Sequence, residues 1–518
     1  MHVYAWAALI RCERTQKACL LMLLTPLCAR VCAQVRAILG LQHKKTYSED
    51  ASGSESREGL RYGRLMLMTD QDHDGSHIKG LVFNVFHFFW PSLLKRKGFV
   101  VEFVTPLVKA TPRGVEKDKK AARRGTLSFY TSRDFEEWFR SLKPGEASKW
   151  HIKYYKGLGT SDADEAKDYF SDLVKHKIDM VWGGEEDDQA LLMAFGDDAD
   201  RRKDWLSSNP ANESPTVDHS VHEMSYKDFV YKELIQFSHA HMIRSIPSVI
   251  DGLKPGQRKV LYSCFIRKLH TETKLTQLAG HVSEKTAYHH GETSLFGTII
   301  KMAQDFVGSN NLPLLLPAGQ FGTRLQGGND HASPRYLHTR LMPHVRLAFR
   351  EEDDAVLEHA QEDGESVEPV HFVPIIPMIL VNGAEGIATG WSTSIPMHCP
   401  LQVIDTVADA VKNDYTKKES LAPLLPWYAG FTGKLQEQIN RDGLQEFLTF
   451  GRVEQLSSGK GAIANRTVVV TELPIGRWTS EFQSLLDKLC QDGGEGGQGL
   501  VQNYRQESTQ DEVKFEVI

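Results

Sequence analysis

The sequence predicts a multidomain protein in which domains of the α/β and α+β classes follow one another. Its 518 residues are too many for a single hydrophobic core, so two to four domains are expected. Residues 41 to about 185 alternate between strand-like and helix-like patterns, whereas residues 223–374 are mostly helical. From residue 375 onward, strand-like runs are again mixed with helices. This order predicts an α/β domain, a mainly helical domain and a mixed third domain.

The first domain contains a short apolar strand that runs into an acidic turn. Leu65–Met68 are apolar, and Asp70, Asp72 and Asp74 follow at alternate positions before Gly75. An apolar, helix-like segment stopped by a proline comes next, which completes a strand–turn–helix unit. Acids at the carboxyl end of a strand lie where α/β sheets usually carry their chemistry. Carboxylates this close repel one another unless a divalent cation such as Mg²⁺ neutralises them, so a metal site is predicted.

The acidic turn could also be a calcium loop or a solvated turn. The pattern D-x-D-x-D-G opens an EF-hand calcium loop, but that loop needs a glutamate at its twelfth position. Counted from Asp70, the twelfth residue is Leu81, which excludes the calcium loop. The other alternative is a solvated acidic turn that binds no metal, and the pattern alone does not exclude such a turn.

The composition is that of an ordinary soluble globular protein, with 41% hydrophobic and 25% charged residues. The net charge of −6 would by itself argue against a nucleic-acid partner. The charge is uneven, however: residues 254–274 carry six Lys and Arg against one acid, and residues 351–368 carry nine acids and no Lys or Arg. A local basic face is what phosphate binding requires. The seven cysteines form no C-x-x-C pair, so neither a zinc site nor a disulfide framework is expected.

Several segments, in order along the chain, resemble the eukaryotic-type DNA topoisomerase II family, of type IIA. The acidic turn lies in TDQDHDGSHIKGL, which is similar to the metal-binding core of the family's Toprim domain. Further similar segments are YYKGLGTSDADEAKDYFSDL from Tyr154, SIPSVIDGLKPGQRKVLYSCF from Ser245, AYHHGE from Ala287, LLLPAGQFGTRLQGGNDHASPRYLHTRL from Leu314 and IIPMILVNGAEGIATGWSTSIP from Ile375. Several blocks in order are far more specific than any one motif.

The resemblance implies a division into domains. It implies a Rossmann-like Toprim domain at residues 38–185, a linker at 186–222 and a winged-helix (helix-turn-helix) DNA cleavage domain at 223–374. Residues 375–518 would form a mixed α/β tower domain, cut short at its end. Residues 1–37 match nothing in the family, and we expect either a targeting peptide or a segment from a misplaced chain start.

By the same resemblance, Tyr336 is the expected nucleophile. It follows Arg335 and lines up with the family's catalytic Arg–Tyr pair. A phenol with a pKa of about 10 needs activation at neutral pH, and an adjacent arginine can stabilise the phenolate or the developing phosphorane charge. Attack on DNA would form a 5′-phosphotyrosine, and the reverse attack would reseal the strand. His290 is expected to support this step near the scissile phosphate, although a purely structural histidine is the alternative.

The resemblance also implies which residues bind metal and how many chains act. Asp70, Asp72 and Asp74 would hold the divalent cation, Mg²⁺, which serves a tyrosine from the partner protomer. A homodimer that makes two staggered cuts is therefore expected. A bacterial gyrase arrangement is less consistent with the sequence, because those enzymes place Toprim and tyrosine on separate chains, whereas Asp70 and Tyr336 share one chain here.

The expected contacts with double-stranded DNA come from three segments. Lys254, Arg258 and Lys259 precede or open an amphipathic helix of a helix-turn-helix, for which a charged solvent face is the alternative. His289 is expected to contact phosphate. Ile387 lies between Gly386 and Gly390. By the resemblance, it corresponds to the isoleucine that the family inserts between base pairs to bend the DNA. The alternative is that Ile387 is simply a buried residue.

The function implied is that of a DNA topoisomerase of type II, an ATP-hydrolysing isomerase that passes one duplex through another. The Glu-Gly-Asp-Ser-Ala motif that opens the family's Toprim domain is not found, nor are its ATP-binding domain and coiled-coil gate. The chain is therefore expected to supply the cleavage–religation core, while ATP binds elsewhere in the full-length enzyme. A non-catalytic DNA-binding and bending fragment is the competing hypothesis. A nuclear location is expected, or an organelle if the N-terminal segment is a targeting peptide. No membrane association is expected, because the apolar run of the N-terminal segment is too short to span a bilayer.

Overall fold

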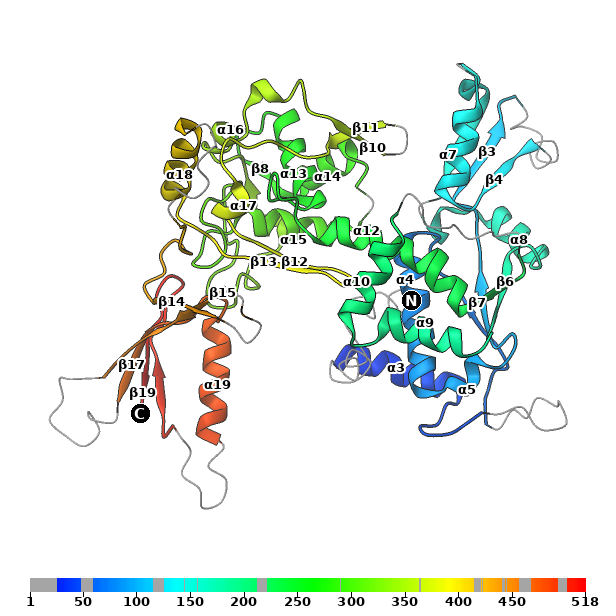
Figure 1. Cartoon of the computed structure of the whole chain (residues 1–518), viewed down its shortest axis with the longest axis horizontal. Helices are drawn as coiled ribbons and strands as arrows, with labels where there is room; N and C mark the ends of the chain where they lie inside the picture. The colour runs from blue at the N-terminus through cyan, green and yellow to red at the C-terminus, as the bar shows by residue number, and fades with distance from the viewer. Residues whose placement is uncertain are drawn as a thin grey trace. The chain divides into compact units, whose positions relative to one another are not determined.

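The computed structural model describes residues 26–47, 59–114, 125–211, 221–413, 421–455, 467–491 and 501–518, apart from 144, 156, 289, 363–364, 422, 440–442 and 444. The chain divides into two compact units (Figure 1). Unit 1 comprises Met1–Met242 together with Ala388–Trp391, and unit 2 comprises Ile243–Ile387 and Ser392–Ile518. Most of the unmatched segment 1–37 lies outside the described residues, and α3 (Pro26–Leu39) follows the undescribed part directly.

The central sheet of unit 1 is mixed. Its strand order is β1-β2-β6-β7, with bounds Leu65–Leu67, Val100–Phe103, Lys177–Val181 and Glu223–Ser225. The outer pairs β1–β2 and β6–β7 are parallel, and the central pair β2–β6 is antiparallel. β2 is buried at every position, as expected for a strand covered on both faces. The predicted strand before the acidic turn is confirmed as β1.

Helices pack around α4 (His73–Phe89), which directly follows the acidic turn. α4 contacts α9 (Glu185–Phe195) and the π-helix η3 (Phe229–Leu234). Gly80 permits this close packing, because a Cβ at that position would lie 2.7 Å from the Phe195 ring. The remaining helices of this core are α3, α5 (Pro91–Leu94), α10 (Ala199–Ser208), α11 (Tyr226–Asp228) and α12 (Ile235–Ser245).

A second, antiparallel sheet in unit 1 has the order β4-β3-β5 (Leu127–Phe129, Val108–Pro112 and Trp150–Tyr154). Helix α7 (Ser132–Ser141) contacts β4. Helix α8 (Ala163–Ser171) begins with a complete capping box made by Asp162 and Glu165. The short helices η1 (Ala147–Lys149) and η2 (Leu158–Thr160) lie on either side of β5 in sequence.

The segment 186–222, expected to be a linker, begins instead with two helices of unit 1. α9 contacts α4, α11 and η3, and α10 buries Trp205 and Leu206. Four acids in the first turn of α9 favour a helix N-terminus at this point of the chain. The boundary between the two units lies at residue 242/243, within α12.

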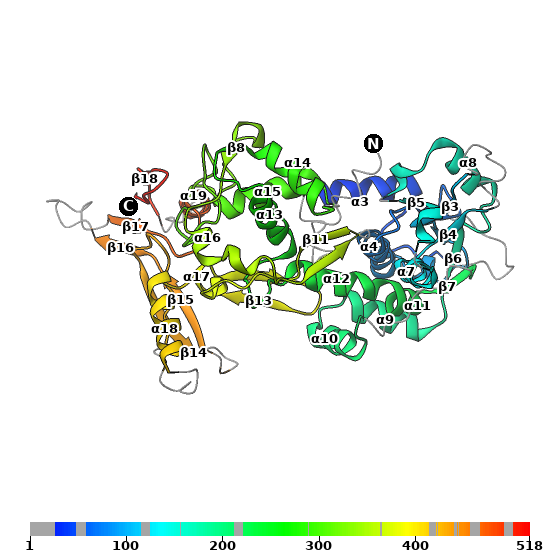
Figure 2. The ribbon, with the colours of Figure 1, turned by 90° about the horizontal axis from the view of Figure 1, so that it is seen from above.

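Unit 2 begins with three helices that contact one another, α13 (Pro255–Ile266), α14 (Leu275–Lys285) and α15 (Glu292–Ala303). They lie together in both views (Figures 1 and 2). The short strands β8 (Thr273–Lys274) and β9 (His338–Thr339) pair beside them, and α13 and α14 fit the expected helix-turn-helix. Further elements are η4 (Pro334–Tyr336), α16 (Val345–Ala348), η5 (Glu351–Asp353), β10 (His359–Glu362), β11 (Glu365–Pro369), α17 (Met378–Val381) and α18 (Pro400–Lys412).

The C-terminal part of unit 2 is mixed α/β, as predicted. β12 (Ala384–Ile387) and β13 (Ser392–Ile395) form a hairpin, and β14 (Lys434–Ile439) and β15 (Gln445–Phe450) form another antiparallel pair. The final sheet has the order β16-β17-β19-β18 (Arg452–Gln455, Val468–Glu472, Phe515–Val517 and Tyr504–Gln506). Helix α19 (Thr479–Gln491) shares a small apolar core with this sheet. Within the described part of the chain, no helix has the length and apolarity needed to cross a bilayer.

Candidate functional site

The acidic turn is held in one conformation by the start of α4. Asp72 is the N-cap of α4, and its Oδ1 accepts a hydrogen bond from the Gly75 amide at 2.7 Å. Gly75 has to be glycine, because a Cβ there would lie 1.9 Å from the carbonyl oxygen of Asp70. The turn therefore carries Asp70 and Asp72 at the carboxyl end of β1, with both residues exposed.

The charges of the turn affect one another. Although part of Asp72 is exposed to solvent, the protein around its carboxylate partly desolvates it, and this is the first cause that raises its pKa. The negative charges of Asp74 and Asp70 raise the pKa further. Among the described residues, no three His, Cys, Asp or Glu side chains converge to hold one ion. Since Mg²⁺ in proteins commonly takes one or two carboxylates and completes its shell with water, the hard oxygen donors of this turn fit such an ion without a third acid.

A glycine-containing loop approaches the same acids. A Cβ at Gly157 would lie 2.9 Å from Oδ1 of Asp70, so the loop after β5 passes directly over this carboxylate. The loop is anchored by Tyr155, whose hydroxyl donates to Glu165. Glu165 also accepts from Lys153 Nζ at 2.9 Å and Lys109 Nζ at 3.1 Å. Although burial opposes the ionisation of Glu165, hydrogen bonds from Tyr155, Lys153, the amide of Asp162 and Lys109 lower its pKa to about 2.

Behind the acidic turn lies a buried ionic cluster that the sequence prediction missed. Lys79 of α4 contacts the carboxylates of Glu102 on β2 and Glu233 on η3, and all three are largely buried. Ser76 Oγ donates to Glu233 at 2.7 Å, which ties the first turn of α4 to the cluster. Burial and the neighbouring Glu233 raise the pKa of Glu102. A lysine within the apolar helix sequence HIKGLVF was the available signal, since a buried charge needs a partner.

Tyr336 is exposed to solvent on a segment that buried and hydrogen-bonded neighbours hold in place. It is the last residue of η4, and 67% of its surface is exposed. The neighbouring Leu337 is fully buried, and His338 and Ala318 exchange hydrogen bonds at 3.0 and 3.2 Å. The guanidinium of Arg335 lies 5.2 Å from the centre of the Tyr336 ring. The expected pair is thus adjacent and accessible, and α14 packs against the short helix that carries it.

Of the two histidines expected near the phosphate, the structure describes only His290. His290 is exposed just before α15, with its ring 5.5 Å from that of Tyr288. His289 lies outside the described residues.

Arg258 and Lys259 are not on the surface, which corrects their expected role in contacting DNA. Arg258 is buried and donates from Nε and Nη2 to Asp251 at 2.7 and 3.0 Å. Lys259 Nζ donates to Thr286 O at 2.7 Å and to carboxylates of the acidic segment 351–368, Glu362 at 2.7 Å and Glu368 at 3.0 Å. Charges in the interior need such partners, and these partners occupy the donors that a phosphate would need. Lys254, half-buried before α13, is the member of the group nearest the surface.

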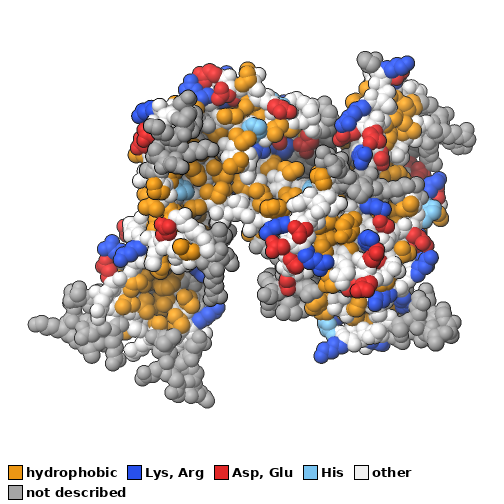
Figure 3. Space-filling model, viewed as in Figure 1, with side chains coloured by type: hydrophobic (Ala, Val, Ile, Leu, Met, Phe, Trp, Pro, Cys, Tyr) orange, Lys and Arg blue, Asp and Glu red, His pale blue; other side chains and the backbone are white. Residues whose placement is uncertain are grey.

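On the face of unit 1 visible in Figure 3, blue and red side chains are interspersed, without a broad area of one sign.

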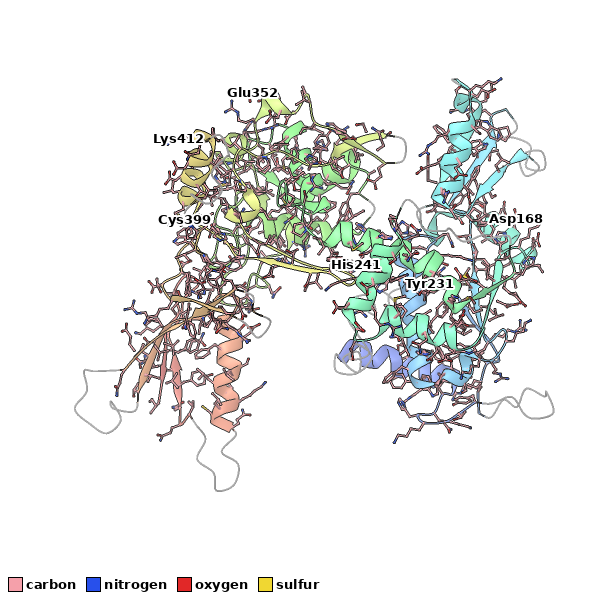
Figure 4. The ribbon with its side chains drawn as sticks, in the orientation of Figure 1. Asp168, Tyr231, His241, Glu352, Cys399 and Lys412 are labelled. Carbon is pink, nitrogen blue, oxygen red and sulfur yellow. The ribbon has the colours of Figure 1, made fainter. Side chains whose placement is uncertain are left out.

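Ile387 ends β12, pairs with Ser392 and is 42% exposed. The residues after it, Ala388–Trp391, belong to unit 1. There the Thr389 hydroxyl lies 3.1 Å from Nδ1 of His241, a residue labelled on α12 in Figure 4. Lys203 Nζ also lies 5.8 Å from the Trp391 ring centre. The exposure of Ile387 does not support the alternative of a simple buried residue.

Comparisons with known proteins agree with the division at residue 242/243. Residues 103–242 match the family model of the C-terminal associated domain of TOPRIM, and residues 244–518 match that of the A subunit of DNA gyrase/topoisomerase IV. The mitochondrial DNA topoisomerase 2 of Dictyostelium discoideum is 48% identical over 93% of this chain and 34% of its own length. DNA topoisomerase 2 of Arabidopsis thaliana is 47% identical over 93% of this chain and 31% of its own.

A solved structure is similar over most of the chain. The DNA-binding, cleavage and re-ligation domain of Plasmodium falciparum topoisomerase II matches with a TM-score of 0.68 and 42% identity, over 94% of this chain and 61% of that one. The chain spans about a third of the length of the curated relatives it matches. The resemblance inferred from the sequence motifs is confirmed: the chain belongs to the type II DNA topoisomerase family.

Proposed function

We propose that this chain provides the DNA cleavage and religation core of a type II topoisomerase, with Tyr336 as its nucleophile. The observation that carries the proposal is the exposed side chain of Tyr336, on a segment fixed by buried Leu337 and next to Arg335. The phenol oxygen forms a bond to a DNA phosphorus while the bond from phosphorus to the 3′-oxygen breaks. The phenol proton is released, and the departing 3′-oxygen gains one. The reverse attack restores the DNA, so neither step consumes water or ATP. Arg335 stabilises the negative charge on the non-bridging oxygens of the phosphorane.

Asp70 and Asp72, with Asp74 beside them, would hold the divalent cation, for which Mg²⁺ is the proposed ion. The chemistry that such an ion supplies is stabilisation of negative charge on the leaving oxygen or anchoring of a neighbouring phosphate. The chain's own contribution is to orient the carboxylates, through the N-cap of α4 and the close passage of Gly157 over Asp70. ATP would be used by the whole enzyme for duplex passage.

The proposed partners are double-stranded DNA and a second copy of the chain. Ile387 would insert between base pairs, and His290 would support the reaction near the phosphate, with His289 and Lys254 as phosphate contacts. A nuclear or organelle location is proposed, in line with relatives that include a mitochondrial enzyme. The second candidate is a DNA-binding and bending fragment without cleavage activity. It is favoured by the sequence, in which the Glu-Gly-Asp-Ser-Ala motif of the family is not found.

Trapping of covalent protein–DNA adducts tests the choice between the two functions. The wild-type chain with Mg²⁺ should form adducts, and Tyr336→Phe should form none. Tyr504→Phe, which removes a hydroxyl on the distant strand β18, is the matched control and should behave as wild type. DNA binding by the wild type without any Tyr336-dependent adduct would favour the bending fragment.

The metal role has its own variant. Asp72→Asn keeps an N-cap side chain but removes the charge, so adduct formation should need more Mg²⁺ while α4 stays folded. Asp164→Asn, at an exposed position of α8, is the control. Identical Mg²⁺ titrations for Asp72→Asn and the wild type would remove Asp72 from the metal site.

A further inference from the structure

The segment between Phe321 and Tyr336 has little apolar packing of its own. Phe321 and Leu337 are buried at its two ends, but no hydrophobic side chain of residues 322–336 is buried. The chain closes into a loop through the Ala332 amide, which donates to Gln320 O at 2.9 Å. Near its end, Ala332 packs against the core of unit 2 and η4 contacts α14. Along the rest of its length, the position of this tyrosine-bearing loop depends on polar contacts.

One set of contacts acts inside the loop. Asp330 accepts from the Thr323 amide at 2.8 Å, and the Gly328 amide donates to Thr323 O at 2.8 Å. Gln304 of the adjoining chain segment donates from Nε2 to Phe321 O at 2.9 Å and to Gly328 O at 3.2 Å. These bonds fix the shape of the loop, but they do not fix it to the rest of unit 2 beyond Gln304.

A second set fixes the loop to the C-terminal sheet of unit 2. The guanidinium of Arg324, 5% exposed, contacts the carboxylate of Glu472 at the end of β17 and donates to Leu473 O at 3.0 Å. Glu472 is 3% exposed and also accepts from the amides of Leu473 at 2.8 Å and Thr432 at 3.1 Å. A carboxylate this deeply buried with several donors is a fixed attachment point, because each donor restricts its position.

The loop also packs directly against the side chain of Trp478, with no space for a further atom between them. Gly327 has φ +60°, and a Cβ there would lie 2.3 Å from the Trp478 indole. Two residues further on, the Ser480 amide donates to Leu325 O at 3.0 Å. The loop therefore rests against the segment that connects β17 to α19.

We infer that Arg324, Glu472 and Trp478 are positioning residues for Tyr336: the C-terminal sheet holds the tyrosine-bearing loop and thereby sets where the phenol meets DNA. This inference rests on the proposed nucleophilic role of Tyr336. All three residues act on Tyr336 through the loop.

Hydrogen exchange in the intact chain tests the attachment without any chemistry. Glu472→Gln should speed exchange of the Ala332, Tyr336 and His338 amides by about tenfold, since a hydrogen bond to a charged group is lost far from them. Glu507→Gln, which breaks exposed ion pairs in the same sheet, should leave these amides unchanged. Equal exchange in the Glu472→Gln variant and the wild type would overturn the inference.

Glycine variants provide a second, independent perturbation. Gly327→Ala combines a left-handed backbone with the Trp478 clash, whereas Gly476→Ala adds a methyl at φ +77° with nothing within 4 Å. Only Gly327→Ala should speed exchange at Tyr336, and adding Trp478→Ala should remove part of its effect. Equal effects of the two glycine variants would mean that backbone strain, and not contact with Trp478, is responsible, which would overturn the role of Trp478.

Single-turnover adduct formation on pre-bound, nicked duplex then separates positioning from binding. Glu472→Gln should react about tenfold more slowly while its affinity for the duplex changes by less than about twofold. An unchanged rate would overturn the inference. If the wild type and Tyr336→Phe gave the same adduct signal, the proposed function would fail, whereas the exchange experiment would still decide whether the sheet holds the loop.

Discussion

Replacing Arg258 by methionine should destabilise unit 2, rather than simply weaken DNA binding. Asp251 is fully buried, and three groups satisfy it: the Arg258 guanidinium at 2.7 and 3.0 Å and the amides of Leu253 at 2.9 Å and Phe372 at 3.0 Å. Breaking a buried ion pair by removing one partner costs about 3–5 kcal/mol. Because two amides remain, we expect the lower end, about 3 kcal/mol, which corresponds to an opening equilibrium about 10²-fold larger.

Hydrogen exchange of the α13 amides measures this opening directly. The double variant Asp251→Asn with Arg258→Met removes both charges, so it should recover a large part of the loss. Lys285→Met, at an exposed ion pair on α14, is the control and should change stability by less than about 0.5 kcal/mol. The reasoning would be refuted if Arg258→Met left α13 exchange unchanged but lowered duplex affinity and flattened its salt dependence, since that is the behaviour of a phosphate contact.

Three more variants probe other parts of the molecule. Gly75→Ala should lower stability by about 1–3 kcal/mol, because its Cβ would lie 1.9 Å from Asp70 O, whereas Gly297→Ala, in open space on α15, should be neutral or slightly stabilising in the same thermal melts. Because the pKa of Glu165 is lowered to about 2 from 4.5, its stabilisation is present above pH 4.5 and is lost as the pH falls toward 2. In the Glu165→Gln variant, the melting temperature should therefore change less with pH over that acid range. A pH dependence parallel to that of the wild type would contradict the stabilising role of the Glu165 carboxylate that binds Tyr155. Ile387→Ala should reduce bending of a labelled duplex, measured by energy transfer between its ends, without changing the salt slope of binding, and unchanged bending would exclude insertion by this residue.

The sequence by itself determined the family and the local features of the site. Alternating acids after an apolar run predicted a strand, a turn and a helix, and the structure has β1, the Asp72 cap and α4 at those positions. The motif around Tyr336 pointed to a tyrosine next to Arg335, and in the structure this tyrosine is exposed with the guanidinium beside its ring. Such features depend on neighbours within a few residues, so short patterns contain the information.

Only the tertiary structure decided which charges are available to a ligand. Arg258, Lys259 and Lys79 appear as basic residues in the sequence, yet all three are buried and paired with carboxylates. The partner of Arg258 is nearby Asp251, whereas Lys259 and Lys79 are paired with acids from other strands. Arg324 is likewise paired with a remote acid, since its partner Glu472 is 148 residues away. The tertiary structure also decided that Ala388–Trp391 belong to unit 1. The physical reason is that a buried charge needs a partner that offsets its desolvation, and for Lys79, Lys259 and Arg324 only long-range packing brings that partner close.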